Sequence, residues 1–423
     1  MEFEKYKLRD IADVMISGVD KKIHEDEIPV KLCNFVDVYK NWAITSSLKE
    51  SFMRATAKQI EIDRFLLHKG QVAITKDSET RNDIGIATYI ADDFDDVILG
   101  YHCALITPNK ELVDSKYLNA FLHSNYILRY FELHATGSGM RYTLSNDTIL
   151  NMPILLPSME QQKAIGKMFS NIDKQIETLN ALNRNLEQVA RQLYDYWFVQ
   201  FDFPNEDGKP YKSSGGEMQL NSRLKRSIPA TWHCVSLIDI ANFTNGLACQ
   251  KFRPTNNNEK LPVIKIREMR DGFTADSEWV TSKIPDNVKI YNGDVLFSWS
   301  ASLEVMIWAN GNGGLNQHIF KVTSKKGYPK SFYYFALLDY VGVFKAIADA
   351  RKTTMGHITR EHLEQSTIAV PTDLQVLIAF ENKVSPILNS IIRNKEKSLQ
   401  LKKMRDELLP MLLNGQVNCD LSQ

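Results

Sequence analysis

A chain of 423 residues with 43% hydrophobic and 24% charged residues has an ordinary globular composition, which excludes a fibrous or disordered protein and suggests two or three domains. Lys plus Arg and Asp plus Glu both total 51, so the formal net charge is zero, which argues against a uniformly basic protein that coats nucleic acid. The five cysteines lie far apart without C-x-x-C spacing, so neither a zinc site nor a disulfide framework is expected.

The N-terminal stretch MEFEKYKLRD is charged and lacks the apolar core of a signal peptide. No apolar run approaches the roughly 18 residues that a membrane span needs. We therefore expect a soluble protein of the cytoplasm.

Four stretches recur in the same order in the two halves of the chain. Residues 8–12 (LRDIA), 68–72 (HKGQV), 101–106 (YHCALI) and 153–157 (PILLP) match 237–241 (LIDIA), 291–295 (YNGDV), 317–322 (QHIFKV) and 367–371 (TIAVP). The offsets are 229, 223, 216 and 214 residues, so the spacing drifts slowly, as in a duplication whose loops have changed length. Chance similarity of short strands is the alternative.

A long amphipathic pattern follows the last stretch of each half. The apolar positions of the first pattern are Ile165, Met168, Ile172, Ile176, Leu179, Leu182, Leu186, Val189 and Leu193. Those of the second are Phe380, Val384, Ile387, Ile391, Leu401, Met404 and Leu408, with the polar Asn394 on the same seam. Steps of three and four predict coiled-coil-like helices, each about 50 Å long, that bury their stripes against each other. The alternative is two core helices of ordinary domains.

The remaining segments predict α+β domains. Short β-rich runs at 72–75, 97–106, 263–266, 295–298 and 318–322 alternate with helical patterns such as 115–131 and 331–348. Residues 203–210 (FPNEDGKP) and 213–216 (SSGG) have the composition of turns and linkers.

Catalytic motifs are absent from the sequence. We find no phosphate-binding G-x-x-x-x-G-K-[ST] loop, no H-E-x-x-H, no G-x-S-x-G and no Pro-Pro dipeptide of an amino-methyltransferase motif. His102 and His318 occupy equivalent places in the two halves, and we interpret both as hydrogen-bonded packing residues within apolar strands rather than as catalytic groups.

Loops that mix cations with hydroxyl, amide and aromatic side chains are the candidate DNA-binding sites. Glycine lets the backbone approach a phosphate, Lys and Arg neutralise it, and Arg, Asn, Ser and Thr also read base edges. The candidates of the first half are Lys76, Ser78, Thr80, Arg81, Asn82, Ser138, Arg141 and Tyr142. Those of the second half are Lys265, Arg267, Trp299, Ser300, Ser302, Lys352, Thr353, Thr354 and His357, with Lys265, Arg267 and Arg270 expected on a strand edge. A solvated surface role is the alternative for each residue.

The whole chain resembles the specificity (S) subunit of type I restriction-modification systems. The stretches that carry the resemblance are 154–157 (ILLP) before 160–165 (EQQKAI), then 203–216 (FPNEDGKPYKSSGG) and 228–232 (IPATW). The second block departs from the pattern, because 372–376 reads TDLQV where the first block has an EQQ run.

The resemblance implies an α+β fold in which two homologous α/β target-recognition domains are separated by two long antiparallel coiled-coil helices. It implies target-recognition domains at 1–157 and 230–371, conserved helices at 158–200 and 372–415, a linker at 201–229 and a tail at 416–423. The helix-docking and partner-docking positions would be Ile165, Ile172, Ile176, Leu186, Leu193, Val384, Ile387, Ile391, Leu401 and Leu408.

The resemblance also implies a function without catalysis. Each domain would read one half of a split target in double-stranded DNA, and the helices would set the spacer and dock two methyltransferase (M) subunits. S-adenosylmethionine would be held by M, and ATP and Mg by the restriction (R) subunits, so this chain would need no cofactor or metal. The alternatives are a coiled-coil adaptor that binds proteins without reading DNA and an enzyme with an unrecognised site.

Overall fold

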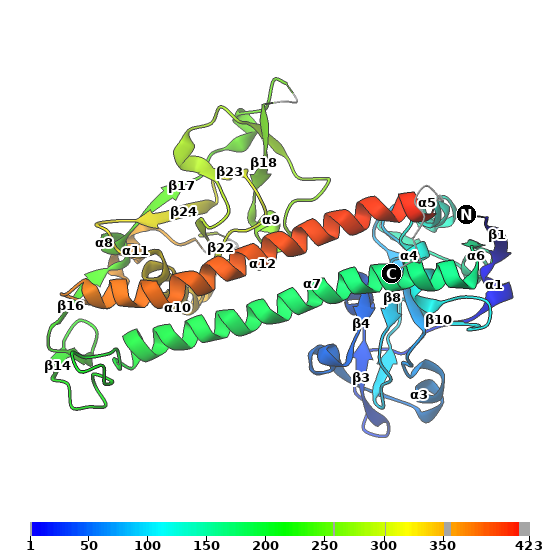
Figure 1. Ribbon diagram of the computed structural model, residues 1–423, viewed down its shortest axis with the longest axis horizontal. Coiled ribbons are helices and arrows are strands. Elements are labelled where there is room, and N and C mark those ends of the chain that lie inside the picture. The colour runs from blue at the N-terminus through cyan, green and yellow to red at the C-terminus, as the bar shows by residue number, and fades with distance from the viewer. Residues whose placement is uncertain (1, 257–258, 301, 351–356, 414–423) are drawn as a thin grey trace. The chain divides into compact units, whose positions relative to one another are not determined.

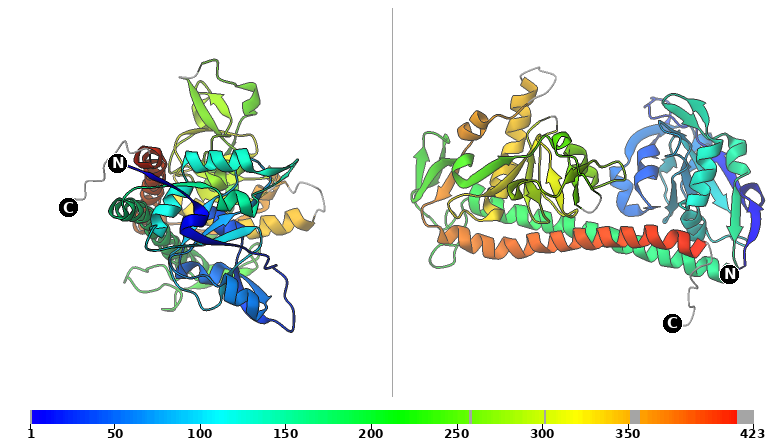
Figure 2. Two further views of the ribbon diagram at one scale, coloured as in Figure 1. Left: turned by 90° about the vertical axis from the view of Figure 1, so that its right-hand side faces the viewer. Right: turned by 90° about the horizontal axis from the view of Figure 1, so that it is seen from above.

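The computed structural model describes residues 2–256, 259–300, 302–350 and 357–413. The chain divides into two compact units, unit 1 (Met1–Glu177 with Leu401–Gln423) and unit 2 (Thr178–Gln400). Two long helices, α7 (Met159–Tyr194) and α12 (Gln375–Leu413), each contribute a stretch to both units. Within each unit these stretches lie side by side (Figures 1 and 2).

Unit 1 is built on a five-stranded sheet of order β2-β10-β6-β8-β4, beside a three-stranded sheet of order β5-β3-β9 and a second one of order β11-β12-β7. Its strands are β1 (Glu4–Lys7), β2 (Ala12–Ile16), β3 (Ile28–Cys33), β4 (Ala43–Ile44), β5 (Met53–Ala57), β6 (Val72–Thr75), β7 (Asp77–Ser78), β8 (Ala87–Ile90), β9 (Val97–Leu99), β10 (Cys103–Pro108), β11 (Thr136–Ser138), β12 (Arg141–Thr143) and β13 (Pro153–Leu156). Its shorter helices are α1 (Leu8–Ile11), α2 (Phe35–Lys40), α3 (Gln59–Phe65), α4 (Ser115–Leu122), α5 (Asn125–His134) and α6 (Asn146–Leu150), with a 3-10 turn at Ser46–Ser51.

Unit 2 is built on a four-stranded sheet of order β17-β24-β21-β22 and another of order β19-β18-β23-β20. Its strands are β14 (Met218–Asn221), β15 (Arg226–Pro229), β16 (Trp232–Ser236), β17 (Ala241–Asn245), β18 (Lys260–Ile264), β19 (Trp279–Thr281), β20 (Lys289–Ile290), β21 (Val295–Ser298), β22 (Glu304–Ile307), β23 (Gly313–Leu315), β24 (Ile319–Ser324) and β25 (Thr367–Pro371). Its shorter helices are α8 (Leu237–Ile240), α9 (Ile266–Asp271), α10 (Lys330–Ala350) and α11 (Arg360–Gln365), with 3-10 turns at Cys249–Lys251 and Asp286–Val288.

The two units repeat the same strand pairing at the level of single residues. Val14 on β2 lies opposite Ile106 on β10, and Phe243 on β17 lies opposite Val322 on β24. Ile106 also lies opposite Val72 on β6, as Val322 lies opposite Val295 on β21. These pairs are related by the offsets 229, 216 and 223 that the sequence matches predict. The duplication and the α+β fold with two long helices are therefore confirmed.

The helix pair of unit 2 is antiparallel and has a polar contact on its seam. The buried Asn183 of α7 accepts a hydrogen bond from the side-chain amide of Asn394 at 2.8 Å, and its own amide reaches the carbonyl of Ile391. Further along, Phe198 packs on Phe380 with ring centroids 4.8 Å apart. Asn394 thus lies on the seam as predicted, where a paired amide fixes the register of the two helices.

Burial separates the predicted seam residues into three groups. Ile165, Ile172, Ile176, Val384, Ile391 and Leu401 are buried, while Leu186, Leu193, Ile387 and Leu408 are half-buried. The prediction is wrong for Leu182, Val189 and Met404, which remain 45%, 45% and 42% exposed. In unit 2, Asn183 and Ala190 take the buried face of α7 instead. Leu182 and Val189, one residue before them, are turned away by about 100° around the helix because it has 3.6 residues per turn.

Turns divide two of the predicted elements. The strand predicted at 97–106 is β9 and β10, because Gly100, Tyr101 and His102 form a turn between them. The helix predicted at 115–131 is α4 and α5, which begin at the caps Asp114 and Ser124. His102 and His318 lie in turns that precede β10 and β24, so the prediction that they lie within strands is wrong.

The segment 201–229, predicted as a linker, folds against unit 2. Its strands β14 and β15 pair as a hairpin. Phe203 stacks on Trp232 at 5.1 Å, and Phe201 meets the same indole edge-on at 5.4 Å. A short π-helical turn, Asp195–Val199, leads from α7 into this cluster.

One helix in the described part of the chain, within α10 at Lys330–Ala348, is long and apolar enough to cross a membrane by length and composition, which the sequence reading did not anticipate. Phe332, Leu337 and Phe344 of this helix are each at most 1% exposed and belong to the hydrophobic core of unit 2. A core helix therefore accounts for its apolar composition.

Candidate nucleic-acid interface

A polar surface of unit 1, here called surface 1, forms where β7 pairs with β12. Tyr142 lies opposite Ser78, and Thr143 lies opposite Asp77. The pairing brings together the two loops that the sequence singles out separately. Surface 1 comprises Lys76, Asp77, Ser78, His102, Arg141 and Tyr142.

Asp77 is the centre of a hydrogen-bonded network on surface 1. Its carboxylate lies 2.5 Å from Nδ1 of His102 and 3.4 Å from Nζ of Lys76. Lys76 also donates to Oγ1 of Thr143 at 3.1 Å. Burial raises the pKa of Asp77, but hydrogen bonds from Thr143 and His102, together with the charge of Lys76, lower it below its ordinary value. The ionised carboxylate therefore fixes the position of the lysine beside the exposed hairpin.

The β11–β12 hairpin projects exposed side chains from surface 1. At Gly137, φ is +123° and an added Cβ would lie 2.1 Å from the carbonyl oxygen of Arg141, so only glycine fits there. Ser138, Met140 and Arg141 are exposed. Arg81 donates to the carbonyl of Ala135 at 3.0 Å, which joins its loop to the base of the hairpin.

In the part of unit 2 that the structure describes, the equivalent surface, here called surface 2, is built around an aromatic ring. The ring of Trp299 lies 5.7 Å from that of His318 and 5.5 Å from that of His357. The indole nitrogen donates to Oδ1 of Asn245 at 3.1 Å. Ser300 pairs with His357 as an isolated bridge and is 4% exposed. Nδ1 of His318 is buried and has no hydrogen-bond partner within the described residues.

Equivalent backbone hydrogen bonds position the two surfaces in their respective units. The amide of Lys76 donates to the carbonyl of His102 at 2.7 Å, and the amide of Trp299 donates to the carbonyl of His318 at 3.3 Å. The carbonyl of Lys76 accepts from the amide of Leu144, as that of Trp299 accepts from Ile358. A lysine and a tryptophan thus occupy one position of the repeated frame.

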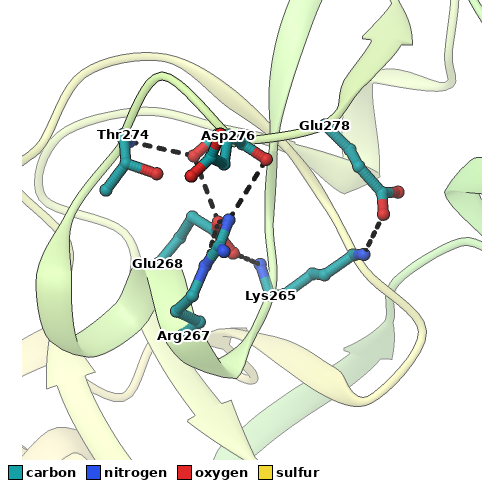
Figure 3. Close-up of polar contacts among 7 residues, drawn as sticks. Lys265, Arg267, Glu268, Thr274, Asp276 and Glu278 are labelled. Carbon is teal, nitrogen blue, oxygen red and sulfur yellow. Dashed lines mark hydrogen bonds and ion pairs between the residues drawn. The ribbon is translucent and has the colours of Figure 1, made fainter. Parts of the chain in front are cut away.

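Lys265 and Arg267 belong to a network of polar contacts with Glu268, Asp276 and Glu278 (Figure 3). They cap and begin α9, so the prediction of a strand edge for Lys265, Arg267 and Arg270 is wrong. The physical reason is a capping box in which the amide of Lys265 donates to Glu268 at 3.2 Å.

Carboxylates already neutralise the cations of α9. Nζ of Lys265 lies 2.5 Å from Glu278, and Arg267 lies 2.7 Å from the buried Glu268. Burial raises the pKa of Glu268, but its hydrogen bonds from Arg267 and Ser277 lower it below the ordinary value. A phosphate would have to displace these carboxylates to bind here.

The structure places the other predicted residues as follows. Thr80 and Asn82 are exposed in the loop after β7. Ser302 is half-buried, and its carbonyl accepts from the hydroxyl of Ser298. Lys352, Thr353 and Thr354 lie outside the described residues. Sequence reasoning missed Asp77 and His102 as members of surface 1, although the repeat-equivalent position of the two histidines was a signal that could have found His102.

The family comparison decides the class of protein. The model of the type I restriction modification DNA specificity domain matches residues 1–188 and 229–402, which is most of the chain and both halves of the repeat. The chain belongs to this family. Its specificity-subunit relatives include that of the type I restriction enzyme MjaIX of Methanocaldococcus jannaschii, 25% identical over 74% of this chain and 71% of the relative. That of the type I restriction enzyme HindI of Haemophilus influenzae is 22% identical over 80% of this chain and 85% of the relative.

The fold is also that of a solved specificity subunit. The type I restriction-modification S subunit from M. genitalium matches with a TM-score of 0.56 at 13% identity, over 97% of this chain and 96% of the other. The likeness at such low identity shows that the two chains share their fold.

Proposed function

We propose that this type I specificity subunit reads a split target in double-stranded DNA, with surface 1 contacting one half and surface 2 the other. The observation that carries the proposal is one repeated backbone with different side chains at its equivalent positions, Lys76 in unit 1 and Trp299 in unit 2. A shared frame presents both surfaces in the same way, while diverged side chains recognise different bases.

The helices would dock the methyltransferase subunits. Leu182, Val189 and Tyr196 are spaced seven residues apart and are 45%, 45% and 37% exposed. A heptad-spaced apolar stripe on a helix surface is what a partner helix packs against. The two rods would also set the spacer, because half-sites one helical turn apart on DNA are separated by about 34 Å.

The chemistry would belong to the partners. S-adenosylmethionine in the methyltransferase subunits would supply the methyl group for adenine, and ATP with Mg in the restriction subunits would drive cleavage. This chain would contribute recognition and position, without a cofactor or metal of its own, in the cytoplasm.

The test is methylation mapping of DNA incubated with the reconstituted complex of this chain and its methyltransferase, together with a footprint. We expect methylated adenines in two short constant sequences separated by an unprotected spacer of fixed length. Methylation or protection without sequence preference at every salt concentration would overturn the proposal and favour a protein-binding adaptor. Removing the same number of helical turns from α7 and α12 should shorten the spacer and leave both half-sites unchanged.

A further inference from the structure

A groove with a volume of about 420 Å³ opens in unit 2 beside the edge strand β22. Its walls are mostly apolar and come from β22, α10, α7 and α12. The lining residues are Glu187, Arg191, Val305, Met306, Ile307, Tyr334, Phe335, Leu338, Leu388, Ile391 and Lys395. Among the described residues no strand pairs with the outer edge of β22, so its backbone groups on that side are available.

The repeat-equivalent place in unit 1 is filled by the chain itself. There β4 pairs in parallel with β8, the counterpart of β22. The amide of Tyr89 donates to the carbonyl of Trp42 at 3.0 Å, and the amide of Ala91 donates to that of Ile44 at 2.9 Å. An extended segment thus covers the edge that is open in unit 2.

The side chain of Trp42 anchors that segment. Its ring stacks on the half-buried His123 with centroids 4.3 Å apart and lies 6.0 Å from Phe169 of α7. Arg405 of α12 covers the indole at 4.7 Å. The tryptophan is therefore only 8% exposed, between the sheet edge, the α4 end and both long helices.

The register shows which backbone groups of unit 2 are equivalent. Gly70 donates to the carbonyl of Ile90 at 2.9 Å, and Gly293 donates to that of Trp308 at 2.8 Å. Trp308 therefore corresponds to Ile90, and Ile307 and Ala309 correspond to Tyr89 and Ala91. Because successive amides of a strand point to opposite edges, those of Ile307 and Ala309 face the open side.

Two cations, Arg191 and Lys395, line the rim of the groove, and each is paired with carboxylates. Arg191 contacts Asp195 and Asp339, and Lys395 lies 3.2 Å from Glu187. The planar guanidinium of Arg191 can still stack on a ring while its edge is paired. The negative face of an aromatic ring attracts such cations, as the contact of Arg405 with Trp42 demonstrates in unit 1. The walls formed by α7 and α12 are also continuous with the helices that we assign to partner docking.

We propose that this groove binds an extended segment of the methyltransferase partner, which adds a parallel strand to β22 and inserts an aromatic side chain between α10 and the long helices. The identity of the partner rests on the proposed function, whereas the shape of the occupant follows from the repeat. Strand addition supplies backbone hydrogen bonds for affinity, and the pocket supplies selectivity for the side chain.

Hydrogen exchange at single amides tests the proposal directly. In the free chain we expect the amides of Ile307 and Ala309 to exchange quickly, while those of Tyr89 and Ala91, already bonded to β4, exchange slowly and serve as the internal control. On addition of the methyltransferase subunit, the exchange of Ile307 and Ala309 should slow at least tenfold.

A matched pair of variants on α10 completes the test. Leu338→Arg places a charge in the groove and should weaken methyltransferase binding at least tenfold. Val343→Arg, at a position 49% exposed and outside the groove lining, should leave binding unchanged. Both affinities can be measured by calorimetry.

Four outcomes distinguish the possibilities. Protection with weakening by the first variant alone supports the groove. A complex that forms and methylates its target without protecting these amides overturns this inference and leaves the proposed function intact. Protection in a homodimer without methyltransferase assigns the groove to a second copy and overturns the partner. Absence of any complex overturns the proposed function and this inference together.

Discussion

Units 1 and 2 share their strand register but differ in the side chains that the register presents. Surface 1 is organised by the ionised Asp77 and its contacts with Lys76 and His102, whereas surface 2 is organised by the ring of Trp299. The backbone bonds that fix Lys76 and Trp299 are equivalent. Duplication thus conserved the hydrogen-bonded frame while the side chains at its equivalent positions changed.

Exchange of a whole domain is the most severe test of this comparison. Replacing residues 1–157 by the corresponding segment of another family member should change one half of the DNA target completely and leave the other half unchanged. Methylation mapping with the parent protein and with the exchanged protein provides the measurement. A change in both halves would show that the surfaces are not independent.

Point substitutions at the shared position should separate charge from shape. Lys76→Ala should weaken DNA binding and reduce the slope of log affinity against log salt by about 1, because one phosphate contact is lost. Trp299→Ala should cost about 1–3 kcal/mol of binding free energy with an unchanged slope. Lys110→Ala is the control, since this exposed lysine follows β10 at the opposite end of the sheet. Equal salt slopes for Lys76→Ala and Trp299→Ala would contradict the assignment.

The two units differ in which element supplies the carboxylate that accepts hydrogen bonds at the start of a short helix. In unit 1 Asp114 caps α4, and Gly166 of α7 packs closely against it. With an offset of 215 residues, which places Ile172 of α7 on Ile387 of α12, the position equivalent to Gly166 is Glu381. Its carboxylate accepts a hydrogen bond from the amide of Ser331 near the start of α10. The residue before α4 itself supplies the carboxylate in unit 1, whereas the long helix α12 supplies it for α10 in unit 2.

Gly166→Ala should therefore destabilise the protein by about 1–3 kcal/mol. Its new Cβ would lie 2.6 Å from Oδ1 of Asp114 and 2.8 Å from the backbone nitrogen of Tyr117. Gly342 on α10 has open space where a Cβ would be added. Gly342→Ala should therefore stabilise the protein by up to about 1 kcal/mol. Denaturant unfolding of both variants measures their free energies of unfolding. Equal effects would show that the close packing at Gly166 does not exclude a methyl group.

Asp173 gives the smallest expected effect and a defined pH dependence. Burial raises the pKa of this carboxyl on α7 to about 6, although Arg405 opposes the shift. In the unfolded state the pKa of an aspartate is about 3.9, so the folded state binds the proton more tightly. Ionisation of Asp173 therefore lowers the stability of the fold above pH 6, and this loss disappears toward pH 4. The equivalent residue of unit 2, Leu388, carries no charge.

Asp173→Asn should accordingly stabilise the protein by about 1–2 kcal/mol at pH 7.5 and hardly at all at pH 4. Thermal unfolding across this range provides the measurement. A stabilisation that does not vary with pH would contradict the raised pKa.

The sequence predicted those features that depend on periodicity and repetition. The offsets between halves anticipated the strand register, and the three-four spacing anticipated both long helices and the place of Asn394 on their seam. It did not predict the helix at Lys265, because a capping box there needs Glu268 to fold back on the chain. Nor did it predict the contact of Asp77 with His102, which depends on a turn with a positive φ at His102.

The division of α7 and α12 between the units has a consequence for synthesis. Arg405, which covers Trp42, is translated after the whole of unit 2. The first domain to leave the ribosome is therefore incomplete until the last helix is made. The contact that completes it, between Trp42 and Arg405, joins residues very far apart in the sequence. We expect the N-terminal unit to wait as a partly open intermediate during translation, so that the order of folding runs against the order of synthesis.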